Sequence, residues 1–398
     1  MSQSVVKSFL SLKQYCEKEN YYGWDPYDGL NSKIFNSLPF KKFDIARLIW
    51  IQLFKRNPIN LRRLLLVPKE HNPMALALFL QGYCNLYNLS NSDNLGLGDK
   101  KSHLKKIHYL AQLLIKNISL GYSGACWGYN FDWQARRIFL FPKYTPTVVV
   151  TSFCVEALFM AYEITKEVKF LEIASSSAKF VLNDLKRTPH KNGFLFSYSP
   201  ISGNNRVFNA SLLGSKLLSL VFKYTGNSEY IIAAKSSIKA VCESQNKDGS
   251  WVYGLLPVQS WIDSFHTGFN LEAIKTYADI SNDSEFDKNI ERGLDFYMKN
   301  FFTEKGIPKY YNNEIYPIDI HCPGQLFITL SKLNIYNKYN LISSKVMKWT
   351  LKNMQDEKGF FYYQIKKYFS SKISYMRWSN AFMFNSMILY IKDNNQNL

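Results

Sequence analysis

The residues in this sequence that could move protons are concentrated in loops. Five of them carry side chains that serve as general acids, general bases or nucleophiles: Asp132, Asp263, His266, Asp319 and Tyr375. Two carboxylates that face each other across a sugar would allow glycoside hydrolysis, whereas an imidazole or phenol beside a carboxylate held by arginine would allow epimerisation or elimination. The sequence leaves these reaction types open and predicts the five residues as catalytic candidates.

A second group of loop residues could bind a ligand without reacting with it. Indole and phenol rings stack on the apolar faces of sugars, and guanidinium, amide and carboxyl groups hydrogen-bond to hydroxyl or carboxylate groups. We therefore expect substrate contacts from Trp24, Asp25, Asp28, Trp127, Trp133, Gln134, Arg136, Arg137, Tyr198, Arg206, Asn209, Trp251, His321, Arg377 and Trp378.

Several of these residues have structural alternatives that the sequence does not remove. Asp263 lies three residues before His266, so its carboxylate could simply cap a helix. The two loop histidines could be hydrogen-bonded core or capping residues. Arg377 precedes an apolar helix, where the positive end of the helix dipole disfavours a lone cation. We expect it to contact an anion, which is either a ligand or a protein carboxylate such as Asp132 or Asp319.

Apolar residues at helical spacing dominate the rest of the chain. The segment 100–118, for example, places Leu104, Ile107, Ala111 and Leu114 on one face, and Thr145-Pro146-Thr147 is typical of a helix start. About thirteen helices are predicted, near 2–19, 43–56, 72–90, 100–118, 147–163, 167–184, 208–224, 228–245, 268–281, 284–300, 324–333, 338–355 and after Asn380 to near Ile391.

Four glycines mark an internal repeat: Gly193, Gly249, Gly306 and Gly359 follow one another at intervals of 56, 57 and 53 residues. Each interval fits two helices and a long loop. Hairpins of this kind stack side by side, so we predict an all-α fold, an (α/α)6-type toroid, with residues 1–398 in one domain. The loops before the inner helices should then line one cavity, namely 21–32, 124–146, 191–206, 250–266, 307–321 and 360–379.

The composition limits the kinds of molecule that the protein could bind. The formal net charge is +18, and the chain contains no run of five or six like charges. The excess favours an acidic sugar or polysaccharide as substrate, while the dispersed basic pairs argue against a nucleic-acid partner. The sequence says nothing about the oligomeric state.

The cysteines and the N-terminal residues indicate the cellular compartment in which the protein works. The six cysteines are far apart and form no CxxC motif, which is typical of reduced thiols. The first residues lack the basic start and long apolar centre of a signal peptide. The longest nearly apolar segment, 148–162, is shorter than the roughly 20 residues of a membrane span. We expect a cytoplasmic protein with at most a peripheral membrane association.

Two segments share the spacing apolar-x3-Gln-x3-Gly-x-aromatic. This pattern resembles the QW-type repeat of squalene-cyclase and prenyltransferase-like toroids, which implies the toroid fold but not terpene chemistry, because the same ring serves many activities. The segments are Val241-x3-Gln245-x3-Gly249-x-Trp251 and Leu351-x3-Gln355-x3-Gly359-x-Phe361.

A larger constellation spans nearly the whole chain and resembles a bacterial family met in surface-polysaccharide settings. The resemblance implies a role in surface-polysaccharide biosynthesis. The ring, the aromatic loops, the paired acids and the basic charge favour an enzyme that modifies an acidic sugar, as an epimerase, lyase or hydrolase. The alternative is a non-catalytic glycan-binding or assembly protein. The matching motifs are Trp127 to Gln134, Phe141 to Thr147, Ser197 to Pro200, Asp263 to Glu272, Ile318 to His321 and Tyr375 to Phe384.

A weaker resemblance concerns zinc. The run from Asp263 through His266 to Thr267 is similar to the D-x-Y-H-T segment of protein prenyltransferase β chains, with Asp319 and Cys322 as the remaining candidate ligands. Their order differs from that family, so a zinc prenyltransferase-like enzyme is a minor alternative. The chain has no nucleotide-binding or HExxH motif, and we expect no cofactor and no metal.

Overall fold

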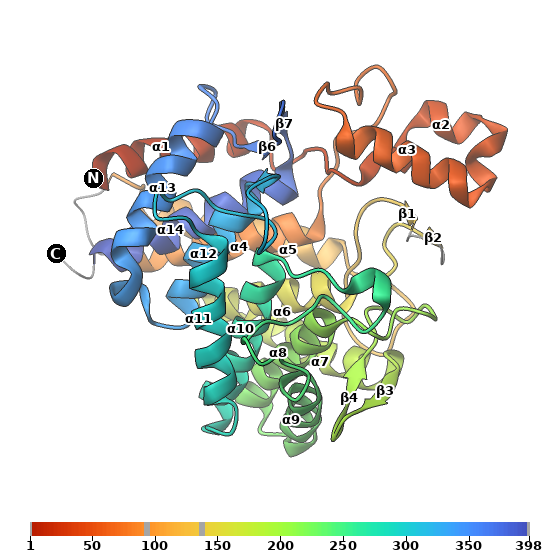
Figure 1. Cartoon of the computed structure of the whole chain (residues 1–398), viewed down its shortest axis with the longest axis vertical. Helices are drawn as coiled ribbons and strands as arrows, with labels where there is room; N and C mark the ends of the chain where they lie inside the picture. The colour runs from red at the N-terminus through yellow and green to blue at the C-terminus, as the bar shows by residue number, and fades with distance from the viewer. Residues whose placement is uncertain (1, 91–95, 135–139, 396–398) are drawn as a thin grey trace.

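The computed structural model describes residues 2–90, 96–134 and 140–395. Six inner helices form a closed ring, because each contacts the next and the last contacts the first (Figure 1). In chain order they are α4 (Pro73–Leu89), α6 (Val148–Thr165), α8 (Phe208–Thr225), α10 (Ser264–Ser281), α12 (His321–Lys332) and α14 (Phe382–Asn395).

A second set of helices packs outside this ring. Five of them follow their inner partners as hairpins, and α1 packs on α14, so the first helix of the chain completes the outer layer. The all-α toroid predicted from the repeat is therefore the observed architecture. The outer helices are α1 (Ser2–Lys18), α5 (Lys100–Lys116), α7 (Val168–Lys179), α9 (Ser228–Cys242), α11 (Asp287–Phe301) and α13 (Asn340–Met354).

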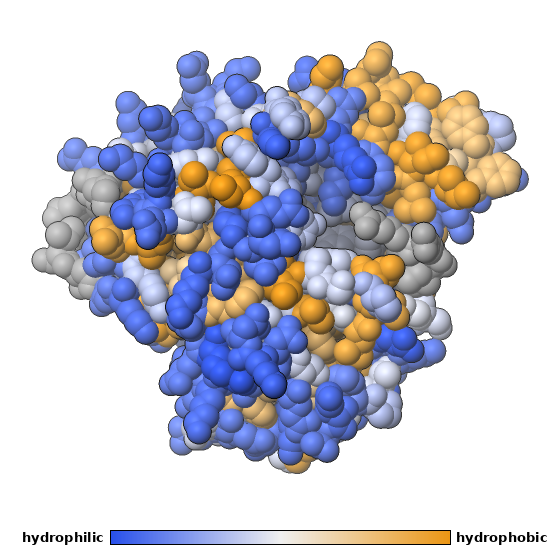
Figure 2. All heavy atoms as spheres, viewed as in Figure 1, coloured by the Kyte–Doolittle hydropathy of each residue, from blue (hydrophilic) through white to orange (hydrophobic). Residues whose placement is uncertain are grey.

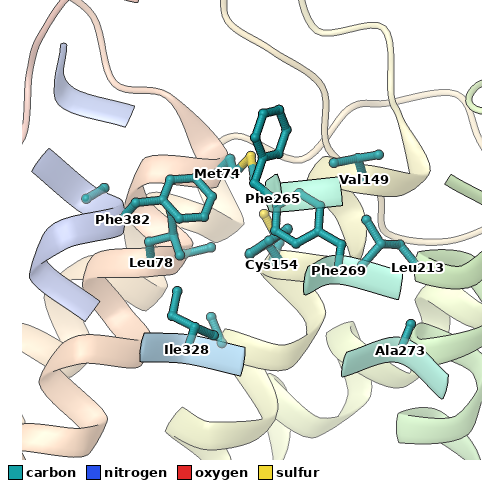
Figure 3. Close-up of a cluster of buried hydrophobic side chains, with 14 of the residues drawn as sticks. Met74, Leu78, Val149, Cys154, Leu213, Phe265, Phe269, Ala273, Ile328 and Phe382 are labelled. Atoms are coloured by element: carbon teal, nitrogen blue, oxygen red, sulfur yellow. The ribbon is translucent and has the colours of Figure 1, made fainter. Parts of the chain in front are cut away.

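The inner helices are apolar on most of their surface because they pack against the outer layer and against one another. α6 is the one helix in the described ranges that is long and apolar enough to cross a membrane by composition, but 72% of that stretch is buried in the ring. Its side chains and those of the other inner helices fill the ring axis (Figure 3). The labelled members are Met74, Leu78, Val149, Cys154, Leu213, Phe265, Phe269, Ala273, Ile328 and Phe382.

The repeated glycines lie where each loop crosses the next outer helix. A Cβ atom on Gly249 would lie 2.2 Å from the carbonyl oxygen of Arg292 in α11, and one on Gly359 would lie 2.3 Å from that of Ser11 in α1. Both glycines also have positive φ angles, +92° and +95°. Only glycine satisfies both conditions, and this requirement explains the repeat period.

The glutamines of the same motif connect neighbouring hairpins. The Gln245 side-chain amide donates to the backbone oxygens of Gly249, at 2.8 Å, and of Asn289 in α11, at 3.0 Å. Gln355 donates in the same way to Gly359, at 3.1 Å, and to Ser8 in α1, at 3.0 Å. The motif thus joins consecutive repeats, and its last copy closes the ring.

The helix that follows Thr145-Pro146-Thr147 begins one residue later than predicted. Thr147 is the N-cap: its hydroxyl accepts from Val150 N at 3.2 Å. Thr147 N donates to Trp127 O at 3.0 Å. Pro146, the residue before the cap, therefore has an extended conformation and is not part of the helix. α10 and α12, in contrast, begin four and three residues earlier than predicted.

Short strands tie the loops at the N-terminal end of the inner ring. β1 (Trp133–Gln134) pairs with β2 (Leu140–Phe141), and β3 (Arg187–His190) pairs with β4 (Gly193–Phe196), both antiparallel. A three-stranded sheet has the order β5 (Ile318–Asp319), β6 (Tyr362–Ile365), β7 (Ser370–Ser374). A π-helical turn, Met376–Ala381, leads from this sheet into α14.

One helical segment lies apart from the ring, between the first loop and α4 (Figure 1). It consists of the 3-10 turn Asp28–Asn31, α2 (Lys33–Ser37), a second 3-10 turn Pro39–Lys42, and α3 (Asp44–Arg56). α3 packs on the two turns and on β1. α2 is so short that no helical periodicity marks it in the sequence.

Candidate active site

The loops before the inner helices meet at one end of the ring. The Phe265 ring at the start of α10 lies 4.6 Å from the His321 ring at the start of α12, and both contact Trp378 of the π-helical turn. Trp378 in turn lies 5.8 Å from Tyr27 of the first loop. Residues from segments far apart in the sequence therefore meet at this end of the ring, which we call the mouth.

His266 and Asp263 form the dyad that is best placed for proton transfer. His266 Nδ1 lies 2.7 Å from Asp263 Oδ2, which also accepts from Trp261 Nε1 at 2.9 Å. The other oxygen, Oδ1, caps α10 by accepting from His266 N at 3.0 Å. Asp263 is buried, whereas the His266 side chain is 20% exposed.

The geometry of the dyad specifies the histidine tautomer. A carboxylate accepts a hydrogen bond, so Nδ1 of His266 carries the proton that faces Asp263. In the neutral imidazole Nε2 then holds the free lone pair, and no side chain in the described ranges hydrogen-bonds to it. The capping alternative for Asp263 is confirmed through Oδ1, while Oδ2 holds the His266 imidazole.

Arg377 is held by the protein and not by solvent. Its Nε and Nη2 atoms donate to the two oxygens of Asp25 at 2.6 and 2.9 Å, and both residues are buried. The guanidinium lies over the rings of Tyr129 and Trp378, 5.0 and 5.1 Å from their centres. The anion expected beside Arg377 is thus Asp25, and neither Asp132 nor Asp319.

Asp28 and Arg62 form a second buried ion pair, and Tyr375 packs against it. Arg62 Nε donates to Asp28 Oδ1 at 2.7 Å, and its guanidinium lies 4.7 Å from the centre of the Tyr375 ring. Burial raises the pKa of Asp28 to about 6, although Arg62 acts in the opposite direction. Tyr375 is completely buried behind Arg62, so its predicted contact with a substrate finds no exposed surface in the described structure.

Asp319 is buried and accepts hydrogen bonds at both oxygens. Oδ1 accepts from His321 N and Trp378 Nε1, at 2.9 and 2.8 Å, and Oδ2 accepts from Gln364 Nε2 at 2.5 Å. Burial raises the pKa of Asp319 to about 6. These contacts fix the turn between β5 and α12 and hold the Asp319 carboxyl in one orientation.

His321 lies in an aromatic box. Its ring is 3.7 Å from the Phe382 ring and 4.7 Å from the Trp378 ring, and neither ring nitrogen has a hydrogen-bond partner among the described residues. Burial, with a contribution from the Arg377 charge, lowers the pKa of His321 well below its usual value. The imidazole is therefore neutral and is not a hydrogen-bonded core histidine.

Aromatic side chains surround the His266 dyad and the neighbouring loops. Tyr253 stacks on Trp261 at 4.5 Å and lies 4.7 Å from the His266 ring. On the opposite loops, the hydroxyls of Tyr129 and Tyr198 are 3.4 Å apart. The partly exposed rings of this group can offer a face to a sugar.

Lys55 of α3 brings a positive charge to the same mouth. Its Nζ atom donates to the Tyr27 hydroxyl at 2.7 Å and lies 4.5 Å from the centre of that ring. The charge also reaches Asp319, whose pKa it lowers against the dominant effect of burial. Lys55 is paired with no carboxylate in the described structure, so it can receive an anionic group of a ligand.

Several predicted site residues form contacts within the protein. Trp127 and Trp251 are core residues: their indole nitrogens donate to Leu114 O and Val241 O, at 2.8 and 3.1 Å, and neither ring is accessible. Asp132 accepts from Lys143 N at 2.7 Å and so closes the loop around β1 and β2.

The remaining predicted residues divide into structural contacts and open positions. Trp24 donates to Val67 O, and Gln134 accepts from Arg47 Nε. Arg206 is exposed, and Asn209 is buried in α8. Trp133 is partly buried and stacks on Phe141. Arg136 and Arg137 lie outside the described residues.

The zinc arrangement is not assembled in the described chain. No three His, Cys, Asp or Glu side chains gather there in a group that could hold a metal ion. Cys322 is a buried free thiol, and Asp319 is engaged by its three donors. His266 instead directs Nδ1 toward Asp263. Prenyltransferase-like zinc chemistry therefore has no support from the geometry.

Sequence reasoning missed residues whose importance arises from distant contacts. Lys55 lies in α3 and Arg62 in the turn that follows it, in a region with many basic residues, and nothing local separates them from surface lysines and arginines. Tyr27 and Tyr129 were within the aromatic loops but were not singled out. A signal for Tyr27 was its position between two aspartates, Asp25 and Asp28, in one loop.

Comparisons with known proteins identify the fold. No family model matches the chain, and no curated protein matches its sequence. Cellobiose 2-epimerase from Bacillus thermoamylovorans superimposes with a TM-score of 0.62 at 13% identity, over 82% of this chain and 90% of that one. An unsaturated glucuronyl hydrolase specific for heparin gives 0.62 at 12% identity, over 100% and 98%.

A third neighbour extends the range of activities found on this fold. The α-mannanase from Bacteroides thetaiotaomicron gives a TM-score of 0.60 at 13% identity, over 82% of this chain and 87% of that chain. The three proteins carry out different reactions, so the shared architecture is a toroid scaffold and does not by itself select a reaction.

Proposed function

We propose that this protein is a sugar-modifying enzyme that acts on an acidic sugar or polysaccharide by proton transfer at His266. The observation that carries the proposal is the His266–Asp263 dyad, with Nδ1 bound at 2.7 Å and the His266 side chain 20% exposed. The structural neighbours include proteins described as sugar epimerases, a glucuronyl hydrolase and a D-mannose isomerase, which supports a carbohydrate substrate.

The state of the carboxylates favours proton abstraction over hydrolysis. Hydrolysis by paired carboxylates needs two that are free to act on opposite sides of a glycosidic bond. Asp25 and Asp319 each have both oxygens occupied by protein donors. Asp263 is committed to the cap and the imidazole. Epimerisation or elimination needs a base beside an acidic carbon, and His266 meets that need.

The proposed reaction begins with a uronate-type sugar. Nε2 of His266 removes the proton from the carbon next to the carboxylate, and the electron pair of that C–H bond moves into the carboxylate system. Lys55 Nζ stabilises the growing negative charge. In epimerisation, water on the other face returns a proton to that carbon, and His266 Nε2 gives its proton up to solvent. In elimination, the substituent on the adjacent carbon leaves as an alcohol, because its oxygen takes the proton from His266 Nε2. A role in surface-polysaccharide biosynthesis would supply such a substrate.

Solvent exchange tests the proposal. The protein is incubated in D₂O with uronate oligosaccharides and nucleotide-linked uronic acids, and NMR follows loss of the proton next to the carboxylate. We expect exchange in the wild type and none in His266→Gln. His190→Gln is the control, because His190 contacts Ser244 Oγ on the β3–α9 side of the ring. Binding without exchange would favour the glycan-binding alternative.

A further inference from the structure

The helical segment that projects from the ring carries an unusual share of the exposed apolar surface. Within the described residues, nine of the 22 large apolar side chains that are exposed lie between residues 33 and 66. Figure 2 shows hydrophobic residues gathered on the surface of the part of the molecule that contains α2 and α3. Soluble proteins seldom leave such a contiguous patch uncovered unless it binds something.

α3 presents a clean apolar stripe to the outside. Ile45, Ile49 and Leu53 follow at helical spacing and are 72, 64 and 42% exposed. The opposite face buries Ile51 and Phe54 against the neighbouring turns. The exposed stripe is therefore not the face that packs on the protein, and the normal polar face of a surface helix is replaced by isoleucine and leucine.

Basic side chains flank the patch. Residues 33–66 contain eight lysines and arginines and one acid, Asp44, which is paired with Arg47. Arg62 is buried against Asp28, and five of the eight are exposed, namely Lys33, Lys41, Lys42, Arg56 and Arg63. Lys41 and Lys42 follow Phe40 in the same exposed turn, and Arg56 ends α3. An apolar stripe bordered by cations is the composition of a helix that lies in the interface of an anionic bilayer.

We infer that the segment formed by α2, the Pro39–Lys42 turn and α3 docks the protein on an anionic lipid bilayer. Self-association through the same patch is disfavoured, because a symmetric dimer would bring Lys41, Lys42 and Arg56 of two copies together. The apolar side chains enter the headgroup region, while the flanking cations pair with lipid phosphates.

Docking also positions the mouth of the ring. Lys55 belongs to α3 and its Nζ atom contacts the Tyr27 hydroxyl, so the membrane-facing helix supplies a side chain to the site. A substrate held at the bilayer surface would lie beside this end of the ring. The docking inference does not depend on the proposed reaction, because vesicle binding is measured without turnover.

The test is co-sedimentation of the full chain with phosphatidylcholine vesicles, with and without phosphatidylglycerol. We expect binding only to the anionic vesicles and weaker binding as salt is raised. Ile45→Ser with Ile49→Ser should weaken binding at least about tenfold, and Lys41→Glu with Lys42→Glu should do the same. Val168→Ser with Ile232→Ser is the matched control on α7 and α9 and should bind like the wild type.

Three results would overturn the inference. The wild type could fail to sediment with phosphatidylglycerol vesicles. The two segment variants could bind as tightly as the Val168 and Ile232 control. Light scattering could show a wild-type dimer that Ile45→Ser with Ile49→Ser converts to a monomer, which would make the patch a self-interface. If the variant Ile45→Ser with Ile49→Ser fails to fold, the variant Lys41→Glu with Lys42→Glu, which changes two exposed residues, provides the test.

Discussion

Arg377 and Asp25 are 352 positions apart in the sequence and form a buried two-pronged ion pair, with contacts of 2.6 and 2.9 Å. The pair joins the first loop of the chain to the turn that leads into the last inner helix. It therefore strengthens the ring at the same junction where Gln355 reaches Ser8. Its chemistry differs from that of a ligand clamp, because the protein itself supplies the carboxylate.

We expect Arg377→Lys to destabilise the fold, because a lysine cannot reproduce the planar two-pronged contact with Asp25 and leaves the buried carboxylate under-compensated. Breaking a buried ion pair costs about 3–5 kcal/mol, and Arg377→Ala should approach that loss in urea unfolding. Arg206→Lys, at an exposed arginine, should leave the midpoint unchanged. Lost sugar binding without lost stability would return Arg377 to the ligand site.

Asp263→Asn should separate capping from catalysis. Asparagine caps helices as well as aspartate, so the melting temperature should change little. When the asparagine keeps the cap, its amide nitrogen takes the place of Oδ2 and cannot accept a hydrogen bond from His266 Nδ1. The His266 tautomer is then no longer held, so turnover in the exchange assay should fall at least about 100-fold. Asp99→Asn, at the cap of α5, is the control and should keep full activity. Equal activity in both variants would remove Asp263 from the mechanism.

Asp319 should make stability depend on pH in a defined direction. Burial raises its pKa to about 6 from the ordinary 3.8, so the native state binds this proton more tightly than the unfolded chain does. The free energy of unfolding should therefore fall as pH rises from about 4 to about 6, with the same sign for Asp28.

Asp319 should contribute on the order of 2 kcal/mol to the difference in the free energy of unfolding between about pH 4.5 and pH 7. Asp319→Asn should remove this contribution, and urea unfolding at the two pH values measures it. The exposed Asp295 provides the control, since Asp295→Asn should retain the wild-type difference. An unchanged pH dependence in Asp319→Asn would show that its carboxyl titrates normally in the folded protein.

Lys216 should be essential for the packing of the inner ring. It lies 2.9 Å from Glu156 of α6 and 3.9 Å from Glu272 of α10, and Lys332 of α12 contacts Glu156 at 2.5 Å. Burial opposes ionisation of Glu156, but the two lysines outweigh it and lower its pKa to about 2. That contribution is present above about pH 4.5 and is lost as pH falls toward 2.

Lys216→Met should lower the free energy of unfolding by about 3–5 kcal/mol at neutral pH, because two buried carboxylates then share one lysine. The double variant Lys216→Met with Glu272→Gln should recover part of that loss, which urea unfolding of both proteins can measure. Equal stabilities of the single and double variants would mean that Lys216 and Glu272 are not coupled.

All six cysteines should be free thiols that react slowly in the native protein. Each is buried, and burial raises the pKa of Cys126 to about 12. Thiol titration should count six groups in denaturant and few before unfolding, and non-reducing mass spectrometry should find no disulfide. Paired cysteines would contradict the proposal that the protein works in the reducing cytoplasm.

The sequence by itself determined the repeat and therefore the ring. Gly249 and Gly359 are required by close approach to the next outer helix, and Gln245 and Gln355 bridge to the same helix, so their spacing is visible along the chain. Helix periodicity is equally local, because it depends on which face of each helix is buried. These features need no knowledge of distant contacts.

Only the tertiary structure decided which polar loop residues remain available for chemistry. Asp25 and Asp28 looked like ligand contacts until Arg377 and Arg62, from distant segments, were seen to bind them. Trp127 and Trp251 have the same residue type as a partly exposed indole such as Trp133, but they are core residues. Burial and long-range pairing depend on how the loops cross at the mouth, and no spacing within one loop encodes that crossing.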